Sequence, residues 1–199
     1  FFIRGIYNNN KLVKIKISKN LIIGDNYRPV LIAEISGNHG GDKKKFLDHI
    51  KKAKIYGADM VKIQTYEPED IVLKQSIKNL RISKGVWKNK NLFELYENAH
   101  TPFEWHYDAF KLAKKIKIPL FSTPFSIRSL EFLKKFNPSI YKISSFEITD
   151  HNLIYEMSKI KKPIILSTGL SNIDEIKDAL KIINKFHNKI IILHCVSGY

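Results

Sequence analysis

Hydrophobic residues recur along this chain with two alternating periods. Short apolar runs of strand length are separated by stretches whose apolar residues fall at helical spacing, as Phe46, Leu47, Ile50 and Ala53 do. The predicted strands are residues 30–35, 60–64, 119–123, 139–143, 163–167 and 189–194. The predicted helices are residues 43–56, 102–117, 126–136, 151–160 and, after a cap at Ser171 or Asn172, a helix to residue 186. This alternation predicts parallel strands joined by right-handed helical crossovers.

Two segments fall outside the repeat. Residues 1–23 alternate apolar and polar positions around Asn8-Asn9-Asn10, which predicts a β-hairpin within an N-terminal extension of residues 1–28. Residues 66–102 are too long for an ordinary connection between a strand and a helix, so we interpret them as a functional excursion. The remaining residues, 29–199, form the predicted main domain.

Two lysines interrupt predicted strands that are otherwise apolar. Lys62 follows Val61, and Lys142 follows Tyr141. A strand inside a parallel sheet normally reads as an unbroken apolar run, and burying an unpaired ammonium group costs free energy. Both lysines lie near the C-terminal ends of their strands, where parallel α/β folds build binding sites. One such lysine could extend its side chain to solvent, but two together favour a site for an anionic ligand.

Polar residues end nearly every predicted strand. They are Glu34, Gln64, Thr123, Lys142 and Ser167. Such a ring is typical of a TIM-type (β/α)₈ barrel, whereas a dinucleotide-binding domain is disfavoured because no Gly-x-Gly-x-x-Gly follows the first strand. These barrels typically need ~250 residues, and this chain has 199. We therefore predict an α/β fold, a (β/α)₈ barrel truncated after about six strands and preceded by an N-terminal β-hairpin.

Charge and composition narrow the classes of partner. The net charge is +15, but of 34 basic residues only Arg4, Arg28, Arg81 and Arg128 are arginines, whose forked guanidinium groups recognise bases and phosphates best. No apolar window is long enough to span a membrane, and the start does not read as a signal peptide. The single cysteine, Cys195, fits a reducing compartment. We expect a cytoplasmic protein with no nucleic-acid or membrane partner.

Hydroxyl and carboxyl groups accompany the two lysines at the strand ends. Hydroxyls that can complete a cradle for phosphate and carboxylate oxygens belong to Thr123, Ser145 and Ser167. Glu34 and Glu147 are interpreted as general acids or bases, as groups that bind sugar hydroxyls, or as salt-bridge partners of the lysines. His39, in a glycine-rich loop at the same end, is either a polar surface residue or a ligand contact.

Four of these segments form ordered sequence motifs. They read IAEISGNHGG at residues 32–41, GADMVKIQTY at 57–66, FSTPF at 121–125 and ILSTG at 165–169. Together they resemble the N-acetylneuraminate (sialic acid) synthase family, and the resemblance extends from about residue 15 to residue 199. Residues 87–106 and 142–150 look most like the pseudaminic acid synthases of that family, since sialic acid synthases tend to carry Ser-Gly-Glu where this chain has Ser145-Phe146-Glu147.

The resemblance implies an enzyme of cell-surface carbohydrate biosynthesis. Family members condense phosphoenolpyruvate with an N-acetylated amino-sugar in its open aldehyde form, giving a nine-carbon 2-keto acid and phosphate. By motif, Lys62 and Lys142 would bind the carboxylate and phosphate of phosphoenolpyruvate, and Glu34 would order the reacting groups. The resemblance assigns substrate binding to Gln64, Thr123, Ser145, Glu147, Ser167, Ser197 and Tyr199, with Ser197 standing where the family usually has Asn.

The resemblance also implies a divalent metal, Mn²⁺ or Mg²⁺, that polarises the aldehyde. The family's metal-binding histidines lie downstream of its His-Cys-x-x-x-Tyr segment, here His194 to Tyr199, so we expect no metal ligand in this chain. We also expect the C-terminal antifreeze-like domain, which reaches the partner's site in the family's homodimer, to be absent. The expectation is an N-terminal fragment of the catalytic barrel, inactive on its own.

Three alternatives remain open on the sequence. An N-acetylneuraminate or legionaminic acid synthase of the same family would differ in the amino-sugar it uses. A Schiff-base aldolase would use Lys142 or Lys62 as an amine nucleophile, which requires a lysine of lowered pKa in an apolar pocket. A basic nucleic-acid-binding module is the non-enzymatic alternative, and salt-dependent DNA binding would reveal it.

Overall fold

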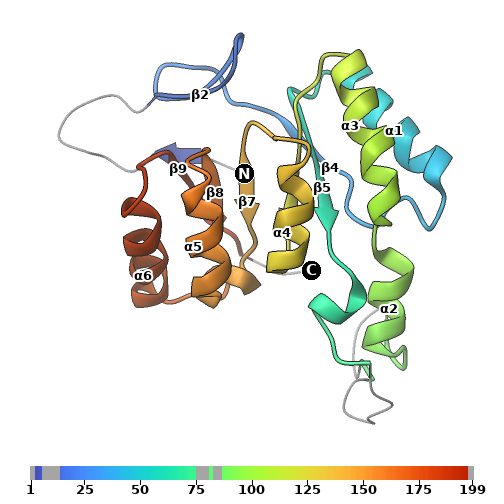
Figure 1. Ribbon diagram of the computed structural model, residues 1–199. Helices are drawn as coiled ribbons and strands as arrows, with labels where there is room; N and C mark the ends of the chain where they lie inside the picture. The colour runs from blue at the N-terminus through green and yellow to red at the C-terminus, as the bar shows by residue number, and fades with distance from the viewer. Residues whose placement is uncertain (1–2, 6–13, 75–80, 83–86, 197–199) are drawn as a thin grey trace.

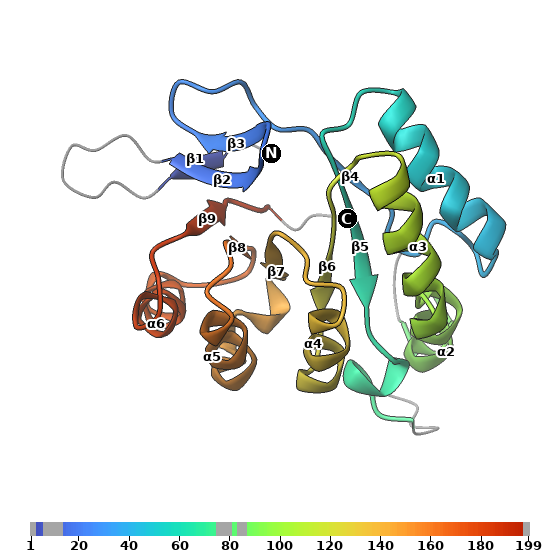
Figure 2. The ribbon, with the colours of Figure 1, turned by 45° about the horizontal axis from the view of Figure 1, so that its top comes forward.

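The computed structural model contains six strands that run in the same direction. It describes residues 3–5, 14–74, 81–82 and 87–196. The six strands are β4 (Ile32–Glu34), β5 (Met60–Thr65), β6 (Leu120–Pro124), β7 (Tyr141–Ile143), β8 (Ile164–Ser167) and β9 (Ile190–Leu193). Parallel ladders join β4 to β5 to β6, and β7 to β8 to β9. Since β6 and β7 lie side by side, the strands follow one curved wall (Figure 2). The predicted α/β architecture is confirmed.

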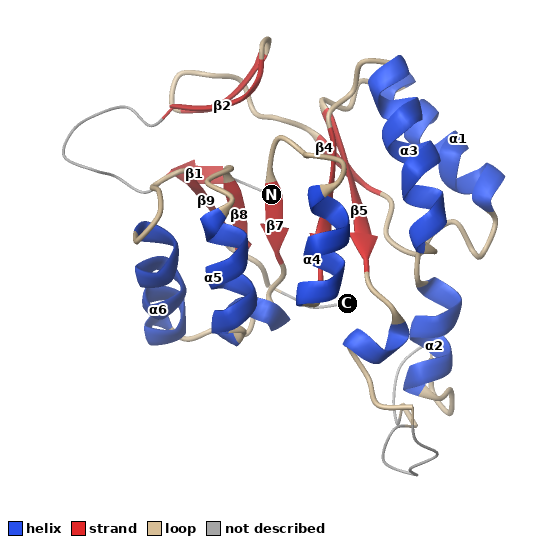
Figure 3. Ribbon diagram, viewed as in Figure 1, coloured by secondary structure: helices blue, strands red, loops and turns tan. Residues whose placement is uncertain are grey.

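The crossover helices cover the outer side of this wall (Figures 1 and 3). They are α1 (Lys43–Ile55), α3 (Phe103–Lys115), α4 (Ile127–Lys134), α5 (His151–Lys159) and α6 (Ile173–Asn184). Side-chain caps fix the starts of all of these helices except α3. At α6, Asn172 rather than Ser171 accepts hydrogen bonds from the backbone N–H groups of Asp174 and Glu175, both at 2.9 Å. Of the two caps considered, Asn172 is therefore the one used.

Side chains alternate strictly between the two sides of the curved wall. On β5, Val61 and Ile63 face outward and pack against α1 and α3, whereas Met60 faces inward. On β7, Tyr141 and Ile143 likewise join the outer core formed with α5 and α6. Because the side-chain period of a strand is two, the residue between two outward positions must face inward. This periodicity directs Lys62 and Lys142 to the inner side.

A β-hairpin closes the N-terminal end of the inner side. Its strands are β2 (Lys14–Ser18) and β3 (Leu21–Gly24), joined through residues 19–20 (Figure 2). The buried side chains of Ile15, Ile17 and Ile23 pack against inward residues of the main strands. Those partners are Met60, Phe121, Ile140, Ile165 and Ile191. The inner side is therefore apolar at this end, which leaves the opposite end for polar groups.

The predicted position of the hairpin turn was wrong. The sequence pattern placed it at Asn8-Asn9-Asn10, residues outside the described part of the chain, but β2 pairs with β3 instead of with a preceding strand. The preceding strand, β1 (Ile3–Gly5), pairs antiparallel with β9, Ile3 lying opposite Leu193. Strand alternation continues through both segments, so it could not show which segments pair; contacts distant in sequence decided this.

The excursion after β5 contains a short 3₁₀-helix, η1 (Pro68–Asp70), and the helix α2 (Leu92–Ala99). The Asn91 side chain caps α2 by accepting the Phe93 N–H at 2.8 Å. The other end of α2 packs against the loop after β4, since a Cβ atom added to Gly37 would lie 2.9 Å from Ala99 Cβ. The excursion is thus held beside the C-terminal strand ends.

Replacing Ile17 by alanine should lower the free energy of unfolding by about 2–4 kcal/mol, because it leaves a cavity beneath the inner side of the strands. The exposed neighbour on the same strand supplies the control: Lys16→Ala should change stability by less than about 0.5 kcal/mol. Urea unfolding followed by tryptophan fluorescence measures both. Equal effects from the two variants would contradict the packing of the hairpin into the core.

Candidate functional site

The C-terminal ends of β4, β5 and β6 bring three predicted site residues into contact. Lys62 forms an ion pair with Glu34 on the neighbouring strand, and its Nζ also donates a hydrogen bond to Thr123 Oγ1 at 3.3 Å. Lys62 lies opposite Phe121 in the β5–β6 register. The salt-bridge interpretation of Glu34 is therefore correct in this structure, and Lys62 has a compensating charge.

Lys142 is the more deeply buried of the two lysines, with 6% of its surface exposed. Its Nζ donates hydrogen bonds to the Ile143 carbonyl oxygen and to Ser167 Oγ, both at 2.6 Å. Both of these partners are neutral, so Lys142 has no carboxylate in hydrogen-bond contact among the described residues. A buried ammonium group without a contacting counter-ion favours an anionic ligand.

Burial and nearby charge shift the pKa values of Lys142 and Glu147, at the C-terminal strand ends. Burial, and then the positive charge of Lys62, lower the pKa of Lys142 to about 7. Burial raises the pKa of Glu147 to about 7 as well, and the nearby charge of Lys142 only partly opposes this. Glu147 Oε2 is buried and has no hydrogen-bond partner among the described residues. Both groups therefore change charge near neutral pH, where a ligand can decide their protonation.

Two other predicted residues take part in the same loops. The Gly169 N–H donates to Ser145 Oγ at 3.0 Å, which ties the loop after β7 to the turn after β8. Gln64 Oε1 accepts a hydrogen bond from Ser36 Oγ at 3.3 Å, beside Glu34. The structure thus places all the predicted site residues that it describes at the C-terminal strand ends. Ser197 and Tyr199 lie outside the described residues.

His39 was interpreted as either a polar surface residue or a ligand contact, and neither describes it here. Its ring is fully buried and packs edge-on against Phe46 and Trp105, at centroid distances of 5.6 and 5.4 Å. Nδ1 accepts the Gly41 N–H at 3.1 Å, so Nε2 carries the proton shared with Thr101 Oγ1 at 3.2 Å. Burial lowers its pKa. His39 therefore holds the first loop in shape as a neutral core residue.

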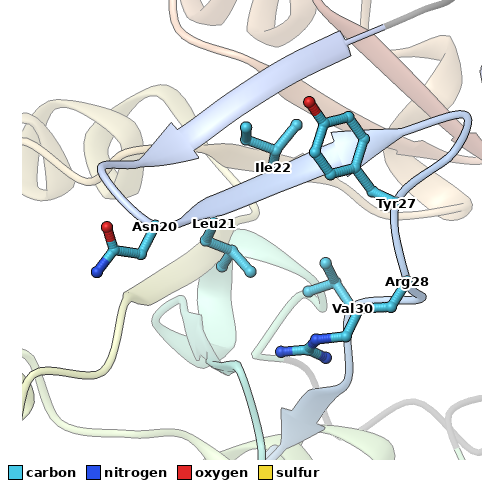
Figure 4. A pocket seen from close by; sticks show the side chains of 6 residues that line it. All are labelled: Asn20, Leu21, Ile22, Tyr27, Arg28 and Val30. Carbon is cyan, nitrogen blue, oxygen red and sulfur yellow. The ribbon is translucent and has the colours of Figure 1, made fainter.

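A pocket at the opposite end of the molecule is separate from this chemistry. Its lining residues are Asn20, Leu21, Ile22, Tyr27, Arg28 and Val30, between the hairpin and the segment leading to β4 (Figure 4). None of the strand-end residues lines it. The lysines and hydroxyls at the C-terminal ends therefore define the candidate site.

Sequence reasoning missed one aromatic residue beside the site. Tyr96, on α2, is half-buried and lies near enough to Glu147 for that carboxylate to raise its pKa, together with burial. The available signal was the unusual length of the excursion after β5, which indicated a functional segment but not the direction of any side chain in it.

The described residues offer no ready metal centre. No group of three or more His, Cys, Asp or Glu side chains converges among them, and Glu34 is already paired with Lys62. The described residues therefore do not form a divalent-metal site by themselves. Within the same residues, no helix is both long enough and apolar enough to cross a membrane.

Sulfate binding should weaken as the pH rises through 7. Protonated Lys142 attracts the anion, so binding is strongest below its pKa of about 7 and declines as the ammonium loses its proton. The loss should be about tenfold between pH 6 and pH 8 for one proton with this pKa, and deprotonation of Glu147 acts in the same direction. Sulfate keeps the same charge between pH 6 and pH 8, so any change in affinity comes from groups of the protein that gain or lose protons.

Titration calorimetry at constant ionic strength measures this dependence. Lys142→Met should bind sulfate weakly and with a flat pH profile, whereas Lys181→Met, at an exposed ion pair on α6, should retain the slope. An affinity in the unmodified protein that stays constant from pH 6 to pH 8 would contradict the role of Lys142.

Curated proteins similar to this chain include pseudaminic acid synthases. The chain is 43% identical over 170 residues to that of Campylobacter jejuni subsp. jejuni serotype O:23/36, covering 85% of this chain and 50% of that protein. It is 41% identical over 172 residues to that of Helicobacter pylori, covering 86% and 51%. The chain thus spans about half the length of these curated relatives.

Solved structures show the same fold. The N-acetylneuraminic acid (sialic acid) synthetase of Leptospira borgpetersenii serovar Hardjo-bovis, in complex with citrate, superposes with a TM-score of 0.81 and 29% identity. The match covers 94% of this chain and 61% of that one. The spore coat polysaccharide biosynthesis protein SpsE of Bacillus subtilis superposes with a TM-score of 0.76 and 26% identity, covering 94% and 49%.

A family model settles the relationship. The NeuB family model matches residues 49–199, which include both site lysines and every described hydroxyl of the cradle. This agrees with the resemblance found in the sequence motifs. The chain belongs to the NeuB family.

Proposed function

We propose that this chain carries the phosphoenolpyruvate site of a nonulosonate synthase that makes pseudaminic acid. The observation that carries the proposal is the imbalance of charge at the strand ends, where Lys62 is paired with Glu34 but buried Lys142 contacts only neutral groups. Phosphoenolpyruvate supplies a carboxylate and a phosphate that match two ammonium groups. The identity to pseudaminic acid synthases supports the choice of product.

The contacts suggest how the donor is held. Lys142, Ser167 and Thr123 offer one ammonium group and two hydroxyls on adjoining strands, and Lys62 adds the second charge. An arriving anion would raise the lowered pKa of Lys142, so binding near pH 7 should be accompanied by proton uptake. The site would thus bind phosphoenolpyruvate as an anion. The Lys142 ammonium is already buried before the ligand arrives, so binding does not have to remove it from water.

The reaction then joins two carbon skeletons. The methylene carbon of phosphoenolpyruvate bonds to the aldehyde carbon of an N-acetylated amino-sugar, water supplies the oxygen of the new keto group, and phosphate leaves. Glu34, which is paired with Lys62, would order the reacting groups, and Gln64 and Glu147 would face the sugar. A divalent Mn²⁺ or Mg²⁺ would supply Lewis-acid polarisation of the aldehyde if residues outside the described part held it. We expect its ligands, and the homodimer contacts, in the half of the relatives not matched here, and the enzyme to act in the cytoplasm.

Removing either site lysine should weaken phosphoenolpyruvate binding by about ten- to a hundredfold, the range of one or two charge-assisted hydrogen bonds. The variants are Lys62→Met and Lys142→Met, and Lys181→Met is the surface control, expected to leave affinity unchanged. Titration calorimetry at pH 6.5 measures all three. Unchanged affinity in both site variants, or no binding to the unmodified chain, would overturn the proposed donor site.

A second candidate, the Schiff-base aldolase, is favoured by one observation, the lowered pKa of Lys142, about 7. One feature opposes it. The Lys142 Nζ is fixed by two hydrogen bonds of 2.6 Å, to a carbonyl oxygen and to a hydroxyl. With the positive charge of Lys62 near enough to affect the pKa of Lys142, this arrangement suits electrostatic binding of a multiply charged anion.

Borohydride reduction in the presence of pyruvate separates the two candidates. We expect no covalent adduct on Lys142 or Lys62, because the donor is bound as an ion and not as an imine. Intact-mass and peptide mass spectrometry give the measurement. A stable mass increase on Lys142 would instead establish the aldolase chemistry.

A further inference from the structure

A chain of hydrogen bonds crosses the outer side of β5 and β6, behind the candidate site. Thr65, the last residue of β5, places its Oγ1 atom 2.7 Å from His106 Nε2 on α3 and 2.6 Å from Ser122 Oγ on β6. At the far end of the chain, His106 Nδ1 lies 3.1 Å from the Pro102 carbonyl oxygen. Thr65, Ser122 and His106 are fully buried, so solvent does not compete for the bonds between them.

The direction of each bond follows from its end groups. The Pro102 carbonyl can only accept, so His106 Nδ1 carries a proton. Burial lowers the pKa of His106 to about 4, so the ring is neutral near pH 7 and Nε2 is a bare acceptor. Thr65 therefore donates its only hydroxyl proton to His106. Ser122 donates to Thr65, with the Ile63 carbonyl oxygen as a second acceptor at 3.1 Å.

Polar side chains are exceptional in this layer of the structure. The outward residues that precede them on β5 and β6 are Val61, Ile63 and Leu120, which pack with apolar residues of α1 and α3. A buried polar chain adds little net stability over apolar packing, but its directional bonds fix distances that apolar contacts leave adjustable. Its position indicates that these bonds fix the C-terminal ends of the two strands.

The backbone ladder between β5 and β6 is weakest at this point. Thr65 lies opposite Pro124, which has no N–H to donate. The next backbone bond, from the Phe125 N–H to the Thr65 carbonyl oxygen, is long at 3.3 Å. The 2.6 Å bond between the hydroxyls of Thr65 and Ser122 is therefore the short link between the two strand ends.

The next residue of β6 faces the site. Ser122 points outward and Thr123 inward, because side chains alternate along a strand. Thr123 Oγ1 accepts a hydrogen bond from Lys62 Nζ at 3.3 Å, across the same two strands. The spacing that the outer hydroxyls set between β5 and β6 is therefore also the spacing between Lys62 and Thr123.

We propose that His106 is a positioning residue of the donor site. Through Thr65 and Ser122 it holds the ends of β5 and β6 at one spacing. That spacing keeps Thr123 beside Lys62 for the phosphoenolpyruvate anion. The inference rests on the proposed function and adds to it a residue that does not touch the ligand. It differs from a purely structural role because it ties ligand affinity, and not stability alone, to the acceptor atom Nε2.

The test measures phosphoenolpyruvate and sulfate affinities by titration calorimetry at pH 6.5. His106→Met fills the space without offering Thr65 an acceptor, and should weaken phosphoenolpyruvate binding about three- to tenfold, the range of one neutral hydrogen bond. Sulfate, which we expect to bind Lys142 on β7, should keep its affinity within about twofold, as for sites without shared partners. His106→Gln offers an amide oxygen to Thr65 and should restore phosphoenolpyruvate affinity.

Thr65→Val has nearly the same shape and removes the donor instead of the acceptor, so it repeats the test if a His106 variant does not fold. It should weaken phosphoenolpyruvate binding to the same degree, and adding His106→Met should weaken it no further, because both changes break one bond. The matched control is Ser158→Ala. It removes a buried hydroxyl that donates to the Ile154 carbonyl oxygen within α5, and it should alter neither affinity.

Nitrogen NMR of the His106 ring checks the bonds directly, and near-ultraviolet circular dichroism checks that each variant is folded. At pH 6.5 the ring signal that is absent from His106→Gln should show a proton on Nδ1 and a bare Nε2. A neutral ring with its proton on Nε2 would overturn the proposal, because Thr65 would then have no acceptor there.

The outcomes separate the two proposals. If phosphoenolpyruvate fails to bind the unmodified chain, the proposed function fails. If it binds, the positioning role of His106 is overturned by any of three results while the donor site stands. They are full phosphoenolpyruvate affinity in His106→Met and Thr65→Val, an equal loss of sulfate affinity, or His106→Gln binding no better than His106→Met.

Discussion

Two ammonium groups in one enclosed space are the constraint on which this site depends. Lys62 and Lys142 lie close enough for the charge of one to lower the pKa of the other, and both are largely removed from water. The mutual repulsion of the two ammonium groups must be offset by nearby negative charge or hydrogen-bond acceptors. Glu34 supplies it for Lys62, whereas Lys142 has only a hydroxyl and a carbonyl oxygen. The fold thus holds one positive charge ready for a ligand.

The curved wall of strands makes this arrangement possible because its apolar and polar inward residues lie at opposite ends. At the N-terminal end the hairpin isoleucines fill the inner side together with inward residues of the strands, such as Met60 and Phe121. At the other end the same inward positions, two residues further along each strand, carry Lys62 and Thr123. The apolar end supplies stability through burial, and the polar end can therefore retain groups that are costly to bury.

The sequence predicted most of this arrangement because period-two alternation and strand order are local properties. Lys62, Thr123, Lys142 and Ser167 were each identifiable as strand-end polar residues, and parallel connection then brought them together. The hairpin turn was misplaced because alternation does not specify a pairing partner. His39 was misjudged because a glycine-rich loop reads as exposed, whereas aromatic rings from α1 and α3 cover it.

The sequence by itself determined the fold class, the family motifs and the presence of two lysines where apolar residues belong. Only the tertiary structure decided which lysine has a counter-ion, that Glu147 leaves a buried oxygen unpaired, and that Tyr96 stands near it. The physical reason is that charge compensation and hydrogen-bond satisfaction depend on distances between elements far apart in the chain. Periodicity shows the side of a strand on which a residue lies, but it cannot show what lies across from it.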